Sequence, residues 1–214
     1  MNVFFDVQEM YYLPQDTPIK VVLEAQCIQV TFVIYLKEGD EARQKSVVGN
    51  ACGNSRVKWV NNELEARALY LKEQPSWLII ANTFQNLDGI HKNTKTALVS
   101  HGIGPKACYY DVSDSVTCVR FVEGPYRTAR LKEMYPAQTF IDTGYAKLDP
   151  IVNGEISHLK PSNLGLDDSK KTILYAPTFY PSSIECLPKD FAKEFSEYNV
   201  ILKPHYFSLA NKKY

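Results

Sequence analysis

The sequence predicts an α/β protein whose first domain is a doubly wound parallel sheet, with helices on both faces. Short apolar runs rich in β-branched and aromatic residues, such as 30–35 and 77–81, are typical of buried strands. Segments with helical spacing of apolar residues separate these runs. Strands that alternate with helices in this way favour a parallel sheet. Right-handed crossovers then bring the loops that follow the strands to one edge of the sheet.

The first connections of this domain contain recognisable helix and turn signals. Strands are predicted at residues 3–7, 30–35, 57–60, 77–81, 96–99, 117–122 and 139–141. The first helix is predicted to begin with Thr17 as N-cap and Pro18 at the first helical position, where these residue types are favoured. The charged segment 37–46 indicates a surface loop or a short exposed helix, and residues 50–54 indicate a turn.

Later connections are predicted in the same manner. Asn61 or Asn62 is expected to cap the helix that leads to the strand at 77–81. Residues 109–115 form an acidic, tyrosine-rich segment that indicates a loop, and residues 126–134 indicate a basic helix. Together with the strands, these segments complete a doubly wound domain.

A composition change marks the end of the first domain. The sequence predicts a first domain at 1–150, a linker at 151–171 and the beginning of a second, Rossmann-like domain at 172–214. The last part contains a strand at 172–176, an amphipathic helix at 188–198 and a strand at 199–202. One β-α-β unit cannot enclose a core of its own. We therefore expect a truncated second domain in a fragment of a longer protein, the alternative being that the last segment packs on the first domain.

Composition and charge exclude several classes of protein. The chain has 214 residues, of which 45% are hydrophobic and 22% are charged, as in ordinary globular proteins. Lys and Arg together number 24, as do Asp and Glu, and no basic stripe is visible, which argues against a nucleic-acid partner. No apolar run approaches the roughly 18 residues of a membrane span, and residues 1–15 show no secretory signal.

Cysteine usage bears on compartment and on metal binding. The five cysteines are dispersed without the close spacings that zinc sites need, namely Cys27, Cys52, Cys108, Cys118 and Cys186. An odd, scattered set indicates reduced thiols in a cytoplasmic protein and no disulfide framework. We also see no carboxylate cluster suited to a metal ion.

The segment 100–106, Ser-His-Gly-Ile-Gly-Pro-Lys, is the principal candidate site. It follows the strand at 96–99, so His101 is expected at the carboxyl edge of the sheet, where open α/β sheets bind ligands. Gly102 and Gly104 allow the backbone to approach a ligand closely. Lys106 adds a positive charge, so the segment suits a proton acceptor beside a phosphate. A structural histidine with a solvated lysine is the alternative.

A second histidine occupies an equivalent place near the end of the chain. His205 follows the strand at 199–202, with Lys203 two residues before it. In a two-domain α/β protein with facing sheet edges, His101 and His205 would point into one cleft. We therefore favour a functional role for the pair over two unrelated packing roles.

Four motifs resemble those of a known family. They are Ser100-His101-Gly102, Gly144-Tyr145-x-Lys147-x-Asp149, Tyr175-Ala176-Pro177-Thr178 and Lys203-Pro204-His205. In this order they resemble the CDP-glycerol glycerophosphotransferases, the teichoic-acid primases and polymerases. The resemblance covers about the second half of the chain. Ala146 stands where the family usually has Pro, and Phe179 stands where it often has Trp followed by Arg.

The resemblance implies a fold and a mechanism. The fold would be GT-B-like, and the reaction would move glycerol phosphate from CDP-glycerol to an acceptor hydroxyl with release of CMP. His101 would act as general base, while His205 and Lys203 would bind the diphosphate. Thr178 would donate a hydroxyl, and Gly102 and Gly104 would let backbone amides approach. Lys147 and Asp149 would fix the interdomain turn.

The resemblance also implies partners. The acceptor would be lipid-linked or a polymer, and no metal or other cofactor is needed. A cytoplasmic enzyme of this kind would work at the inner face of the cell membrane, and the basic helix with Arg127, Arg130 and Lys132 would touch anionic headgroups or form a solvated face.

Two other functions stay open from the sequence. One is a GT-B nucleotide-sugar glycosyltransferase or epimerase of similar architecture. The other is a catalytically silent binding module.

Overall fold

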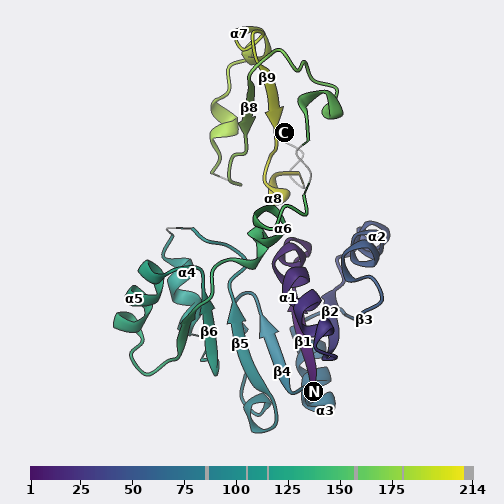
Figure 1. Cartoon of the computed structure of the whole chain (residues 1–214), viewed down its shortest axis with the longest axis vertical. Coiled ribbons are helices and arrows are strands. Elements are labelled where there is room, and N and C mark those ends of the chain that lie inside the picture. The colour runs from purple at the N-terminus through teal and green to yellow at the C-terminus, as the bar shows by residue number, and fades with distance from the viewer. Residues whose placement is uncertain (85–86, 105, 115, 157–158, 180, 210–214) are drawn as a thin grey trace. The chain divides into compact units, whose positions relative to one another are not determined.

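The protein divides into two compact units. The computed structural model describes residues 1–214 apart from 85–86, 105, 115, 157–158, 180 and 210–214. Unit 1 comprises Met1–Glu155 and unit 2 comprises Ile156–Tyr214. Figure 1 shows the elements of both units, which are described separately below.

Unit 1 is built on a parallel sheet that, in the part of the chain described, has seven strands in the order β3-β2-β1-β4-β5-β6-β7. The strands are β1 (Asn2–Val7), β2 (Gln29–Tyr35), β3 (Arg56–Val60), β4 (Trp77–Ile80), β5 (Lys95–Val99), β6 (Val119–Val122) and β7 (Phe140–Asp142). All neighbouring strands pair in parallel, as in the register Phe5↔Phe32 between β1 and β2. The predicted doubly wound α/β sheet is confirmed.

Helices cover both faces of this sheet (Figure 1). They are α1 (Leu13–Ala25), α2 (Glu41–Cys52), α3 (Glu63–Glu73), α4 (Cys108–Asp111), α5 (Pro125–Met134) and α6 (Asp149–Val152). Phe5 packs with Leu13 of α1 and Val48 of α2 in one core cluster, whereas Phe4 packs with Tyr70 of α3 in another. Because successive residues of a strand point to opposite faces, β1 contributes to both cores.

The strand order reverses direction around β1, which has β2 on one side and β4 on the other. In open α/β sheets the loops that leave such a reversal point enclose a crevice at the carboxyl edge. The loops after β1, β4 and β5 all leave the sheet here, so the fold brings three separate chain segments to one place.

Several predicted helix boundaries are wrong. α1 begins at Leu13, not at Thr17, with Pro14 in its first turn and Pro18 inside the helix. Pro14 is tolerated because the first N–H groups of a helix have no partner within it. The turn predicted at 50–54 begins later, since α2 continues to Cys52 and ends where Gly53 adopts a φ of +57°.

Other connections confirm or refine the sequence-based expectations. Asn62 caps α3, because its side chain accepts a hydrogen bond from the Glu65 N–H at 3.0 Å. Segment 109–115 was predicted as a loop, but its described residues enter α4 and a 3₁₀ turn at Val112–Asp114. Local backbone bonds in this segment satisfy groups that an extended loop would leave to water.

Unit 2 contains a two-stranded parallel sheet in its described residues. Its strands are β8 (Thr172–Tyr175) and β9 (Asn199–Leu202), and its helices are α7 (Phe191–Glu194) and α8 (Tyr206–Leu209). The long amphipathic helix predicted at 188–198 is wrong, because only one helical turn forms there. Asn199 ties the sheet to the preceding segment: its Nδ2 donates to the Asp167 carbonyl at 2.6 Å.

Candidate functional site

His101 lies at the carboxyl edge of the unit 1 sheet, directly after β5. Its backbone N–H donates to the carbonyl of Ala81, which follows β4, at 3.2 Å. Its ring Nδ1 lies 2.9 Å from the same carbonyl oxygen. The backbone and the ring of His101 are therefore both held by the end of the neighbouring strand, as the sequence predicted for the edge position.

These contacts determine which ring nitrogen can accept a proton. A carbonyl oxygen only accepts hydrogen bonds, so Nδ1 carries the hydrogen and Nε2 carries the lone pair. Burial lowers the pKa of His101 below its ordinary value of 6.5, because it disfavours the charged ring. The hydrogen bond to Ala81 acts in the opposite direction, and the positive charge of Lys147 adds a smaller lowering. His101 is thus neutral at pH 7, with a basic nitrogen at Nε2.

Tyrosine side chains surround the imidazole ring of His101. Tyr12 stacks on it with ring centroids 4.9 Å apart, and Tyr11 meets it edge-on at 5.5 Å. Tyr109 approaches from the next segment at 5.9 Å. Sequence analysis missed these residues as site components, although Tyr11 and Tyr12 follow β1 and so reach the same sheet edge. The position of Tyr11 and Tyr12 directly after a predicted strand was the sequence signal that could have identified them.

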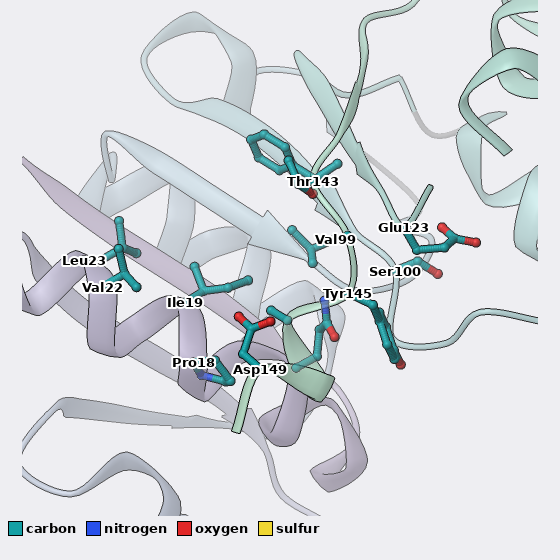
Figure 2. A pocket seen from close by; sticks show the side chains of 14 residues that line it. Pro18, Ile19, Val22, Leu23, Val99, Ser100, Glu123, Thr143, Tyr145 and Asp149 are labelled. Atoms are coloured by element: carbon teal, nitrogen blue, oxygen red, sulfur yellow. The ribbon is translucent and has the colours of Figure 1, made fainter. Parts of the chain in front are cut away.

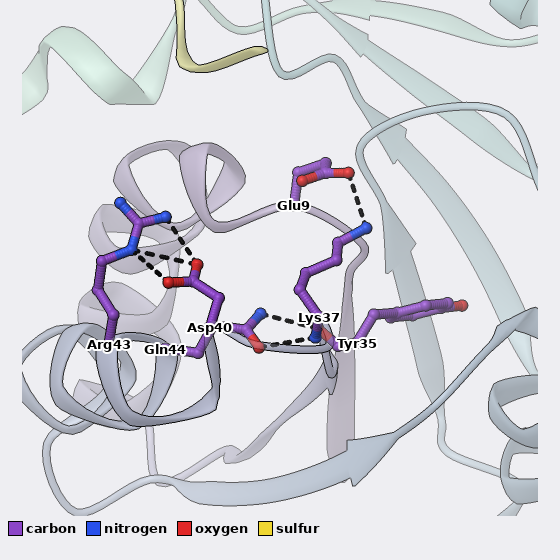
Figure 3. A network of polar contacts seen from close by, with 6 residues as sticks. All are labelled: Glu9, Tyr35, Lys37, Asp40, Arg43 and Gln44. Atoms are coloured by element: carbon purple, nitrogen blue, oxygen red, sulfur yellow. Dashed lines mark hydrogen bonds and ion pairs between the residues drawn. The ribbon is translucent and has the colours of Figure 1, made fainter. Parts of the chain in front are cut away.

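A polar network fixes the loop that carries Tyr11 and Tyr12 (Figure 3). Lys37, which follows β2, forms an ion pair with Glu9 at 2.9 Å. The Lys37 N–H donates to Gln44 Oε1 at 2.8 Å, and Gln44 Nε2 donates to the Tyr35 carbonyl at 2.9 Å. Gln44 is buried, so part of the predicted surface segment 37–46 belongs to the interior. The network joins the ends of β1 and β2 to α2.

The glycines of the candidate loop lie against Tyr109. A Cβ added to Gly102 would stand 2.7 Å from the Tyr109 hydroxyl, and one added to Gly104 would stand 2.5 Å from the ring. A side chain at either position would force the Tyr109 ring to move. Lys106 is exposed, which fits both an anion-binding role and the alternative of a solvated lysine, and Pro105 lies outside the described residues.

The Gly-Tyr-x-Lys motif also reaches this site. The Tyr145 hydroxyl donates to the His101 carbonyl at 2.7 Å, and burial raises the pKa of Tyr145 to about 12. The Lys147 N–H donates to Gln15 Oε1 of α1 at 3.1 Å. Lys147 therefore anchors the turn to α1 and also places its charge close enough to affect His101.

An apolar pocket of about 410 Å³ lies next to this motif (Figure 2). Ile19, Val22 and Leu23 of α1 line one side, and Ser100 and Tyr145 contribute polar atoms. Its size lies in the range of small-ligand pockets. Because Ser100 and Tyr145 also flank or bind His101, the pocket adjoins the candidate site.

In unit 2, His205 follows β9 and lies beside the loop that follows β8. Its Nδ1 accepts a hydrogen bond from the Phe207 N–H at 3.2 Å, so the neutral ring carries its hydrogen at Nε2. Its ring centroid is 4.8 Å from that of Phe179. Thr178 and Lys203 are exposed at the ends of the same paired strands. That His101 and His205 meet across one cleft remains a prediction.

The predicted basic face of α5 needs correction. Arg127 is only 8% exposed, since it binds groups inside unit 1, so it is not available to headgroups. Arg130 is exposed and pairs with Glu133 at 2.9 Å. Within the described residues, no helix has the length and apolarity to cross a membrane, and no cluster of His, Cys, Asp and Glu suits a metal ion. All five cysteines are free thiols.

Solved structures resemble the chain at the level of fold. MnaA of S. aureus, solved with UDP, is 12% identical, with a TM-score of 0.62 over 99% of this chain and 63% of that one. UDP-N-acetylglucosamine 2-epimerase of Rickettsia bellii is 12% identical, with a TM-score of 0.68 over 98% and 63%. The Listeria monocytogenes protein described as the same epimerase is also 12% identical, with a TM-score of 0.65 over 100% and 65%.

These likenesses support the predicted GT-B-like α/β fold. The chain spans 63 to 66% of the length of the first solved proteins that it matches. No curated protein matches it in sequence. The family model for CDP-glycerol:poly(glycerophosphate) glycerophosphotransferase matches residues 56–213, which include His101, the Gly-Tyr-x-Lys motif and His205. Since this match covers well over half of its residues, the chain belongs to the CDP-glycerol:poly(glycerophosphate) glycerophosphotransferase family.

Proposed function

We propose that the protein transfers glycerol phosphate from CDP-glycerol to an acceptor hydroxyl and releases CMP. Family membership supports this reaction. The observation that carries the proposal is the orientation of His101, whose Nδ1–H is bound to Ala81 so that Nε2 retains its lone pair. A neutral imidazole with a lowered pKa is suited to accept a proton at neutral pH.

In the proposed reaction, the acceptor O–H gives its proton to Nε2 of His101. The acceptor oxygen attacks the β-phosphorus of CDP-glycerol and forms a new P–O bond. The bond between that phosphorus and the oxygen bridging to CMP breaks, and CMP leaves with the electron pair. His101 thus acts as a general base, which typically contributes about 10²–10⁴-fold to a rate.

His205 has the complementary role. Because its Nδ1 accepts the Phe207 N–H, its neutral ring presents an N–H donor at Nε2. Such a donor suits a phosphate oxygen, and Lys203 and Thr178 add a cation and a hydroxyl from the ends of the same two strands. The opposite tautomers of the two histidines fit a division between proton acceptance and donor binding.

The acceptor is proposed to be a polymer or a lipid-linked molecule. Its non-reacting part would occupy the pocket beside Tyr145, where the apolar side chains of α1 favour an uncharged group. Glu123 and Asp149 on the pocket wall disfavour an anion inside it. We further propose that the enzyme works in the cytoplasm, at the inner face of the cell membrane.

A nucleotide-sugar reaction is the second candidate, because two of the similar solved proteins are described as UDP-N-acetylglucosamine 2-epimerases. Calorimetric titration of the full-length protein separates the candidates. We expect binding of CDP-glycerol and none of UDP-N-acetylglucosamine. The reverse result would replace the proposed donor.

The proposed function is tested by CMP release from CDP-glycerol with the full-length protein. We expect His101→Ala to lower turnover by about 10²–10⁴-fold while the thermal unfolding midpoint stays near that of the wild type. His91→Ala is a matched control, since His91 bonds to Thr96 near the start of β5, at the end of the strand opposite His101, and lies outside the site. No CMP release by the wild type would favour a binding module, and full activity of His101→Ala would remove His101 from the mechanism.

A further inference from the structure

We propose that Arg127 is a positioning residue that holds the His101–Gly104 loop in its active geometry. This inference rests on the proposed function. Arg127 lies in the first turn of α5, on a different chain segment from the loop. Its guanidinium Nη2 donates to the Gly104 carbonyl at 2.5 Å.

The Arg127 side chain is buried and fixed on its other side. It is 8% exposed, and its Nε pairs with the carboxylate of Glu123, which follows β6. The ion pair sets the direction of the guanidinium fork, because a planar guanidinium has a fixed donor geometry. The Gly104 carbonyl is therefore tied through Arg127 to α5 and, through Glu123, to the end of β6.

Arg127 also supports the loop through aromatic rings. Its guanidinium lies 4.5 Å from the Tyr110 ring centroid and 5.9 Å from that of Tyr109. The Tyr109 ring in turn lies directly against Gly102 and Gly104. A cation over an aromatic face is attractive, so Arg127 holds Tyr109 and Tyr110 on the same side of the loop.

The loop is thus held by its carbonyl groups at both ends. The Tyr145 hydroxyl binds the His101 carbonyl at 2.7 Å, and Arg127 binds the Gly104 carbonyl. Only two residues lie between these anchored positions, so the backbone path after His101 has little freedom. Reacting groups must be held within a fraction of an ångström for efficient transfer.

Packing alone does not account for an arginine here. Burying a guanidinium is costly unless it is paired and hydrogen-bonded, and an apolar side chain fills such a space at lower cost. Arg130 lies one turn later on the same helix and is exposed, so the helix itself does not require a buried cation. What distinguishes Arg127 is its contact with the His101 loop.

The test compares four full-length proteins: wild type, Glu123→Gln/Arg127→Met, Arg127→Lys and Arg130→Met. The double variant removes both members of the Glu123–Arg127 ion pair, so neither of these two groups is left as a buried charge without the other. Arg127→Lys keeps the charge but loses the fork, and it remains informative if the double variant fails to fold. Arg130→Met is the matched control on the same helix.

We expect the double variant to lower kcat for CMP release by about 10²-fold with the KM for CDP-glycerol unchanged. The kcat of Arg127→Lys should lie between that of the double variant and that of the wild type, and the kcat of Arg130→Met should equal that of the wild type. Hydrogen exchange should be faster at backbone amides 101–110 in the double variant. The pKa of His101, followed by NMR, should move up toward 6.5 as its ring gains solvent.

Unchanged exchange at 101–110 and an unchanged His101 pKa in both Arg127 variants would overturn this inference. These two measurements need no substrate, so they decide the positioning role even if the wild type releases no CMP. The absence of CMP release would contradict the proposed function. The amide exchange at 101–110 and the pKa of His101 would then still decide whether Arg127 positions the loop.

Discussion

Asp6 is a carboxylic acid in the centre of the unit 1 core. The hydroxyls of Tyr35 and Tyr70 donate to its Oδ2 at 2.8 and 2.7 Å. Burial raises its pKa to about 6, although the two tyrosine hydrogen bonds act in the opposite direction. The protonated form is therefore favoured in the folded protein up to mildly acidic pH.

This pKa predicts a pH dependence of stability. The folded-state pKa of Asp6 lies above its ordinary value of 3.8, so its contribution to stability is full below about pH 3.8 and is lost as the pH rises through 6. Asp6→Asn removes the titration. The free energy of unfolding of the variant, relative to wild type, should rise between pH 4 and 7.5 by about 2 kcal/mol, at about 1.4 kcal/mol per pKa unit.

Urea unfolding of both proteins across this range measures the difference. Asp16→Asn is measured in parallel as a second variant that lacks a buried carboxyl, because burial also raises the pKa of Asp16 well above 3.8. A constant difference between wild type and Asp6→Asn at all pH values would show that Asp6 does not titrate in this range.

Single residues were predictable where their place in the fold decides their role. His101 follows a strand of a parallel sheet, and its position at the carboxyl edge follows from the topology. Its tautomer depends on the Ala81 carbonyl, twenty positions earlier in the chain, which no local pattern reveals. Arg127 was expected on a solvated face because basic residues usually lie there, and its buried contact with Gly104 depends on tertiary packing.

At the scale of elements, the connection from β2 to α2 depends on one side chain. Gln44 is 1% exposed and bonds to the Lys37 N–H and the Tyr35 carbonyl, as Figure 3 shows. It thereby satisfies two backbone groups at the point where the chain leaves the sheet. Such side-chain hydrogen bonds replace the backbone hydrogen bonds between neighbouring strands, which stop where the strand ends.

Gln44→Leu is expected to destabilise the protein by about 3 kcal/mol, since each buried backbone group left without a partner costs about 1–3 kcal/mol. Chemical denaturation of the variant measures this loss. Lys45→Leu introduces the same side chain at the adjacent exposed position and should change stability by no more than about 0.5 kcal/mol. Equal stability of the two variants would contradict the role assigned to Gln44.

The helix boundaries show the limits of local signals. Thr17 and Pro18 form a common helix start, yet α1 begins one turn earlier at Leu13. Leu13 and Tyr12 pack into the core against β1, and this burial determines where the chain becomes helical. Of the two predicted caps, Asn61 and Asn62, the structure has Asn62, and a cap was predictable here because it is a local interaction with Glu65.

At the scale of the molecule, the two units differ in how much core they contain. β1 and β4 of unit 1 are covered on both faces by buried residues, whereas Leu174 of β8 and Leu202 of β9 are 61% and 44% exposed. Isolated two-stranded sheets are marginal in water. We therefore expect the strands of unit 2 to open more readily than those of unit 1.

Hydrogen exchange of the 214-residue chain tests this difference. Amides of β8 and β9 should exchange at least about tenfold faster than those of β1 and β4, because local opening requires less free energy where few apolar contacts are broken. Amides of the edge strand β3 should exchange at rates between those of these two pairs of strands. Equal protection of β8 and β1 would show that unit 2 is as stable as unit 1.

The α/β class and the strand positions were predictable because apolar runs and the alternation of elements determine a parallel sheet. The seven-strand order and the site around the reversal of that order required the structure, since Tyr12, Ala81 and His101 come from three separate connections. His101 and His205 were selected from the sequence by their equivalent strand-end positions, and their action as a pair stays a prediction.

The tautomer of His101 is the most direct test of the account. Long-range ¹H–¹⁵N NMR of the imidazole at pH 7 distinguishes a hydrogen on Nδ1 from one on Nε2, with His101→Gln used to assign the signal. The predicted result is a neutral ring with its hydrogen on Nδ1 and a lone pair on Nε2. A hydrogen on Nε2, or a ring that is charged at pH 7, would contradict a base at this position.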